Sequence, residues 1–102
     1  MAEERSVKQR LDELRRNIDA IDTQLVRLLS ERAQCALRIG HEKKLAGMDL
    51  YQPSREAEVL DHVQQINKGP LNDAAMKRLF ERIIDEARRL ERIADEARDK
   101  DP

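Results

Sequence analysis

The chain has 102 residues, of which 40% are charged and 2% aromatic, and its formal net charge at pH 7 is −1. A chain so close to neutrality has no overall attraction for nucleic acid or for an anionic membrane surface, and its apolar runs are too short to span a bilayer. Glycine and proline number three each, which leaves few turns, and the abundance of Leu, Ala, Glu, Lys and Arg is typical of long helices. We therefore expect one all-α domain over residues 1–102, with neither nucleic acid nor membrane as a partner.

The first predicted element is a helix from about residue 5 to about residue 44, because its apolar positions alternate in steps of four and three like a heptad seam. The seam consists of Val7, Leu11, Leu14, Ile18, Ile21, Leu25, Leu28, Arg32, Cys35 and Ile39. Arg32 is the one charged member, and a buried guanidinium requires an anionic partner. A helix of this length spans roughly 60 Å, more than so short a chain can cover, so we expect a second copy to pack against it.

Two further helices are predicted after a break at Gly47. Pro53 suits the first turn of the second helix, which ends at the stop signal of residues 67–70. Asn72 or Asp73 can cap the third helix. Residues 94–102 have lost their apolar positions, so we expect this tail to fray and the folded core to cover about residues 7–92.

Four ionisable residues interrupt the apolar faces of these helices, namely Arg32, Lys43, Glu56 and Glu91. Arg32 and Lys43 are eleven residues apart, about three turns, so they point nearly the same way. Two cations and two carboxylates directed inward would form a polar pocket for a small polyanion. The alternative is that each side chain lies along the edge of the core with its charged end in water.

The remaining charges of the third helix are expected to form a solvated face, which includes Glu81, Arg82, Asp85, Arg88 and Arg89. Cys35 is the only cysteine and lies on the seam, so we expect a small core residue. His41 and His62 have no partners at metal-ligand spacing, and no phosphate-binding loop or nucleophile motif is present. We therefore expect no metal and no cofactor. Residues 1–5 do not resemble the start of a secretory signal, so we expect a cytoplasmic protein.

Several motifs resemble those of the all-helical chorismate mutases. In the first helix they are residues 14–22, 28–32 and 39–43; in the second, residues 51–60; and in the third, Arg78-Leu79-Phe80 with Ile83-Ile84. The resemblance extends over about residues 7–92. It implies an intertwined dimer of three-helix chains with active sites shared between both chains, and the Claisen rearrangement of chorismate to prephenate.

The resemblance also implies a role for each matching residue. Arg15 and Arg32 would bind the two carboxylates of the substrate. Lys43 would donate to the ether oxygen and a carboxylate, Glu56 would accept from the ring hydroxyl, and Arg55 would support the site. Arg15 and Arg32 are separated by about 26 Å along one helix, so both can bind one small ligand only if Arg15 comes from a second, antiparallel chain.

Three positions complete or depart from the family pattern. Glu91 matches the residue that contacts the ether oxygen, which is often glutamine in relatives. A carboxylate would repel the charge that develops there, so we expect Glu91 to act in its protonated form, which apolar surroundings favour, unless Lys43 holds it ionised. Ala87 replaces a serine that assists carboxylate binding in relatives, and Gln52 stands where some relatives have aspartate.

Two other interpretations remain open on the residues alone. An isochorismate pyruvate lyase shares the scaffold and a similar anion pocket, although residues 51–60 resemble the mutases more closely. A helical interaction module without a ligand would leave Arg32 without a function, and Arg32→Leu would then stabilise the protein.

Overall fold

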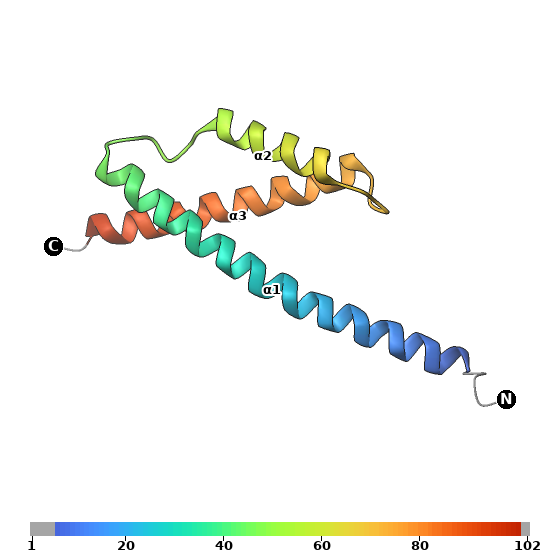
Figure 1. The fold of residues 1–102 in the computed structure, drawn as a ribbon. Coiled ribbons are helices and arrows are strands. Elements are labelled where there is room, and N and C mark those ends of the chain that lie inside the picture. The colour runs from blue at the N-terminus through green and yellow to red at the C-terminus, as the bar shows by residue number, and fades with distance from the viewer. Residues whose placement is uncertain (1–5, 101–102) are drawn as a thin grey trace. The chain divides into compact units, whose positions relative to one another are not determined.

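The computed structural model describes residues 6–100. Over this range the chain forms the helices α1 (Val7–Leu45), α2 (Pro53–Ile66) and α3 (Asp73–Lys100), drawn in Figure 1. The expected all-α class is confirmed. The expected helix start near residue 5 and the last two residues of the tail lie outside the described residues. The chain divides into two compact units, one ending at Arg32 and the other beginning at Ala33, and each is described by itself.

The first unit contains the N-terminal part of α1, which begins with a reciprocal cap. The backbone N–H of Gln9 donates to Oγ of Ser6 at 3.1 Å, and the N–H of Ser6 donates to Oε1 of Gln9 at 2.9 Å. This capping box satisfies two donors that a helix start leaves unpaired. The seam of this unit is exposed, and Ile18, Ile21 and Leu25 retain 55%, 54% and 49% of their accessible surface.

The second unit contains the end of α1 together with α2 and α3. Figure 1 shows α2 lying along α3, and the last turns of α1 crossing the C-terminal part of α3. Val63 of α2 and Ala36 of α1 are the buried apolar residues among those described. Cys35, expected in the core, is exposed instead, because it lies on the seam that this single chain does not cover.

The breaks between helices follow local chemistry. Gly47 adopts a φ of 69°, and the N–H groups of Met48 and Gly47 donate to the carbonyls of Lys43 and Lys44 at 2.8 and 3.2 Å. This is the Schellman arrangement, which ends α1 and requires a residue that tolerates positive φ. After it, Pro53 occupies the first turn of α2, as predicted.

The N-cap of α3 is Asn72, whose Oδ1 accepts the N–H of Ala75 at 2.8 Å. Between the two candidates of the sequence, the structure thus selects Asn72, while Asp73 becomes the first helical residue. The side chain of Asn67 also bridges the turn, because its Nδ2 donates to Oδ1 of Asp73 at 2.9 Å. The side chains of Asn67 and Asn72 therefore provide hydrogen bonds that order the α2–α3 connection.

The C-terminal tail differs from its prediction. Residues 94–100 continue α3 to Lys100 and are not frayed. The apolar pattern does stop, as the sequence indicates, but charge replaces it: Asp95 and Asp99 pair with Lys44 at the end of α1. The prediction failed because ion pairs with a residue so distant in the chain leave no periodic signal.

Within residues 6–100, no helix is both long enough and apolar enough to cross a membrane.

Candidate active site

The end of α1 meets α3 where Gly40 faces Glu91. Gly40 is buried and Glu91 is half-buried. A Cβ atom built on Gly40 would lie 3.4 Å from Cγ and 3.6 Å from Oε2 of Glu91. The side chain of Glu91 therefore approaches the α1 backbone at Gly40, with space for a Cβ atom between them.

Lys43 lies one turn beyond Gly40, at a spacing that makes two residues neighbours on a helix surface. Its side chain is half-buried, and its Nζ donates to the carbonyl of Leu50 at 3.2 Å. This hydrogen bond holds the ammonium group at the connection between α1 and α2. Lys43 therefore follows, by one turn, the position of α1 that Glu91 approaches.

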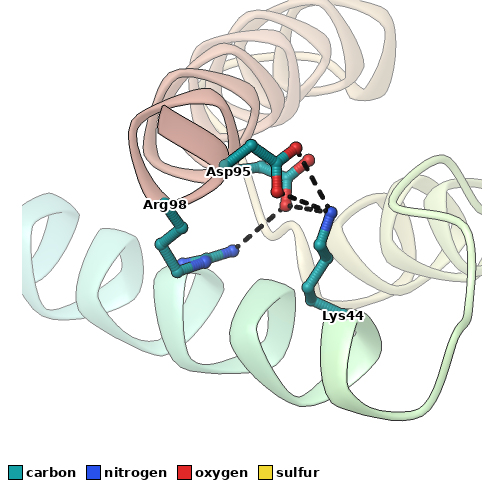
Figure 2. Close-up of polar contacts among 4 residues, drawn as sticks. Lys44, Asp95 and Arg98 are labelled. Atoms are coloured by element: carbon teal, nitrogen blue, oxygen red, sulfur yellow. Dashed lines mark hydrogen bonds and ion pairs between the residues drawn. The ribbon is translucent and has the colours of Figure 1, made fainter. Parts of the chain in front are cut away.

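The next residue, Lys44, forms an ion-pair cluster with the end of α3. Its Nζ lies 3.3 Å from Oδ1 of Asp95 and 3.1 Å from Oδ1 of Asp99, and Arg98 approaches Asp95 at 3.5 Å. Figure 2 shows Lys44 reaching from α1 toward these carboxylates. Hydrogen bonds with Asp99 and then Asp95 raise the pKa of Lys44 above its ordinary value. The cluster holds α3 against α1 one turn beyond Glu91.

Glu56 of α2 faces α3 and is paired with Arg88. Nη2 of Arg88 donates to Oε1 of Glu56, and the guanidinium lies over the ring of Tyr51, 4.9 Å from its centroid. The expectation that Arg88 belongs to a merely solvated face is wrong, because Glu56 of α2 and Tyr51, in the segment before α2, both contact it. Glu56 itself is half-buried, in line with its position on the apolar face of α2.

The other expected residues of α2 and α3 are Gln52, Arg55 and Ala87. The carbonyl of Gln52 accepts the N–H groups of Arg55 and Glu56 at 3.2 and 3.3 Å, and its side chain makes no capping hydrogen bond. Arg55 is exposed and lies 3.5 Å from Glu58. Ala87 is half-buried and precedes Arg88 in α3.

Arg15 and Arg32 belong to the first unit. The side chain of Arg15 is 70% exposed and lies 3.8 Å from Asp12, whereas Arg32 is half-buried. Lys43, Glu56 and Glu91, by contrast, belong to the second unit.

The described part of the chain contains no group of three or more His, Cys, Asp or Glu side chains placed to hold a metal ion. The chemistry available to this group of residues is that of cations and carboxylates: binding anions, donating hydrogen bonds and accepting them.

Comparison with known families matches this arrangement to one of them. The model of chorismate mutase type II matches residues 14–92, a range that includes every residue proposed for the site from sequence. The chain belongs to the chorismate mutase type II family. The resemblance seen in its motifs is confirmed.

Similar proteins carry the same family name. The bifunctional chorismate mutase/prephenate dehydratase of Neisseria gonorrhoeae is 43% identical over 90 residues, which are 84% of this chain and 24% of that protein. A chorismate mutase structure from Thermus thermophilus superposes with a TM-score of 0.80 at 34% identity and covers 81% of this chain and 94% of its own. The Helicobacter pylori chorismate mutase in complex with prephenate also gives a TM-score of 0.80, at 30% identity, over 86% of this chain and 96% of its own.

The chain spans about a quarter of the length of the bifunctional relatives that it matches.

The sequence analysis did not single out Gly40, Lys44 and Arg88 as residues near the candidate site. Gly40 could have been noticed, since a glycine inside a long helix lowers helix stability and therefore suggests a close approach. Arg88 lies four residues after Ile84 on the apolar row of α3, so its spacing did contain a signal. Lys44 gave none, because its partners are more than fifty residues away along the chain.

Proposed function

We propose that this chain is a chorismate mutase that converts chorismate to prephenate by a Claisen rearrangement. The observation that carries the proposal is the placement of Glu91 against Gly40, one turn from Lys43 on α1. An ammonium donor and a carboxyl group so arranged suit an ether oxygen that becomes negative in the transition state. Membership of the chorismate mutase type II family supports the same reaction.

The rearrangement is unimolecular: the ether C–O bond breaks while a new C–C bond forms, and no atom enters or leaves. Catalysis therefore depends on holding the compact conformer of the substrate and on stabilising the developing charge. In the proposed site, Arg32 and the Arg15 of a second chain bind the two carboxylates by charge-assisted hydrogen bonds. The reaction requires no cofactor and no metal.

Charge stabilisation is assigned to Lys43 and Glu91. The Lys43 ammonium donates to the ether oxygen and a carboxylate, and a protonated Glu91 donates to the same ether oxygen. Glu56 accepts a hydrogen bond from the ring hydroxyl, Arg55 supports the site, and the backbone of Gln52 contributes at the start of α2. At position 87, alanine offers no hydroxyl, so a carboxylate contact available to a serine is absent.

The proposal includes a homodimer in which each site takes Arg15 from the partner chain, within one catalytic domain of about residues 7–92. The exposed seam of the first unit supports it, since Leu14, Ile18 and Ile21 each retain more than half of their accessible surface and contiguous exposed apolar surface marks an interaction site. A cytoplasmic location completes the proposal, and the free thiol of Cys35 suits a reducing compartment.

The test is turnover. Purified protein should convert chorismate to prephenate, and Arg32→Ala should leave a folded dimer with negligible activity. Incubation with isochorismate should give no salicylate and no pyruvate, which separates the proposed mutase from a pyruvate lyase on the same scaffold. Production of salicylate at a rate above that of prephenate would replace this proposal with the lyase. Near-normal turnover of chorismate by Arg32→Ala would contradict the assignment of Arg32 to a substrate carboxylate.

A further inference from the structure

Arg88 is a charge that the proposed reaction does not use. It lies in α3, directly after Ala87 and one turn before Glu91, and its Nη2 donates to Oε1 of Glu56. Oδ1 of Asp85 also lies 3.9 Å from the same nitrogen. The Tyr51 ring covers the guanidinium at 4.9 Å from its centroid. Cation–π contact restricts an arginine side chain, so Arg88 is held in place from two sides.

The pairing changes what Glu56 presents to a ligand. A carboxylate that stands alone attracts a cationic group strongly, whereas one already paired with a guanidinium has its charge largely compensated. The side chains of Glu56 and Arg88 retain 26% and 36% of their accessible surface, so their field is only partly screened by water. A second cation brought to Glu56 would also meet the positive charge of Arg88, and like charges in close proximity are unfavourable.

We propose that Arg88 is a specificity-determining residue, which makes the Glu56 subsite select a neutral hydroxyl and reject a protonated amine at the same ring position of the substrate. The inference rests on the proposed function, in which Glu56 accepts from the ring hydroxyl of chorismate. Arg88 leaves Glu56 able to accept one hydrogen bond, and its own charge disfavours an ammonium group beside it.

The experiment compares two substrates on each enzyme: chorismate, and its analogue in which an amine replaces the ring hydroxyl. The measured quantity is the ratio of the kcat/KM values of the two substrates. Where turnover of the analogue is too slow to follow, the ratio of the KM for chorismate to the inhibition constant of the analogue takes its place. Both values come from one preparation, so the folded fraction cancels from the kcat/KM ratio. In the Arg88→Leu variant, the preference should shift toward the amine by about two- to fivefold, the scale of a partly exposed charge pair.

Two variants control for charge and position. Arg88→Lys keeps a cation in α3 and should retain most of the wild-type preference for the hydroxyl. Arg89→Leu removes the same charge from the next residue, which is exposed, and should leave the ratio unchanged.

The outcomes separate this inference from the proposed function. Suppose that the wild type converts chorismate but Arg88→Leu lowers kcat/KM equally for both substrates. Arg88 then only supports the fold, and the inference is wrong. An equal shift in Arg88→Leu and Arg89→Leu would mean that net charge alone sets the preference, which also overturns it. Failure of the wild type to convert chorismate would instead overturn the proposed function.

Discussion

Lys43 and Lys44 are neighbours in the chain, yet their ammonium groups reach different parts of the second unit. Nζ of Lys43 donates to the carbonyl of Leu50 beyond the end of α1, whereas Nζ of Lys44 pairs with Asp95 and Asp99 of α3. Consecutive residues of an α-helix are rotated by about 100°, which explains the divergence. One lysine is therefore available to the proposed site, and the other fastens the helix that carries Glu91.

This divergence makes the two lysines a matched pair for mutation. Lys43→Met should lower kcat/KM by about 10² to 10³-fold, the loss expected for a donor to developing negative charge. Lys44→Met removes the same charge and should retain most turnover while lowering the melting temperature. Steady-state kinetics with thermal melts followed by circular dichroism would measure both. Equal losses of turnover in the two variants would show that Lys43 has no special role.

The Lys44 cluster predicts a specific dependence of stability on pH. Its pairing with Asp99 and Asp95 raises the pKa of Lys44 above 10.5 in the folded chain. A group whose folded-state pKa is raised stabilises the protein fully below its unfolded pKa and loses that contribution as pH rises through the folded value. The difference in melting temperature between wild type and Lys44→Met should therefore be constant at neutral pH and shrink above pH 10.5.

Lys44→Arg provides the control for this prediction, because an arginine stays charged throughout that pH range. The difference in melting temperature between Lys44→Arg and Lys44→Met should persist at the alkaline pH where the difference between wild type and Lys44→Met declines. A parallel decline in Lys44→Arg would assign the alkaline loss of stability to other groups.

Gly40 should tolerate one methyl group but no larger side chain. A Cβ at this position would lie 3.4 Å from Cγ of Glu91, an ordinary contact, and alanine in a helix interior is more stable than glycine by about 0.5 to 1 kcal/mol. Gly40→Ala should thus melt at an equal or higher temperature with turnover preserved. Gly40→Val adds two methyl groups that must displace Glu91, and its kcat should fall by tenfold or more, since small misplacements are costly in catalysis. Wild-type kcat in Gly40→Val would show that Glu91 can move without consequence.

Glu91 should act as a hydrogen-bond donor, in its protonated form, in the proposed mechanism. An ionised carboxylate cannot donate to the ether oxygen, so activity of the wild type should fall as pH rises. Glu91→Gln carries permanent donors, and we expect it to retain or exceed wild-type activity at neutral pH and to remain active at higher pH. The measurement is the pH dependence of kcat/KM for both proteins. A wild-type kcat/KM that does not change with pH would contradict the protonated role of Glu91. It would mean that Glu91 is ionised and that Lys43 compensates its charge.

The exposed seam of α1 should be the dimer interface. Ile21→Glu places a charge on the seam, where burial of an unpaired carboxylate is costly, and should shift the protein to monomers or unfold it. Gln24→Glu adds the same charge three residues later, off the seam, and should leave the dimer intact. Analytical ultracentrifugation, with helix content from circular dichroism, would distinguish the two. A dimer that survives Ile21→Glu unchanged would place the interface elsewhere.

What the sequence determined by itself was local or periodic. The heptad seam from Val7, the stop after Ile66 and the positions of Gly47 and Pro53 predicted three helices, because backbone conformation and apolar spacing act over a few residues. The family motifs predicted the same fold, and the site residues that they indicate stay a prediction. Inward-facing positions such as Glu56 and Glu91 were also visible, since each falls on an apolar face.

What only the tertiary structure decided concerns partners distant in the chain. It paired Arg88 with Glu56 and Tyr51, placed Glu91 against Gly40 and kept α3 helical to Lys100. A charged side chain has the same appearance in sequence whether it is solvated or paired, because the pairing energy depends on a second charge that the fold brings within a few ångströms. For this reason the tail and Arg88 were predicted wrongly, while the helices that carry them were predicted correctly.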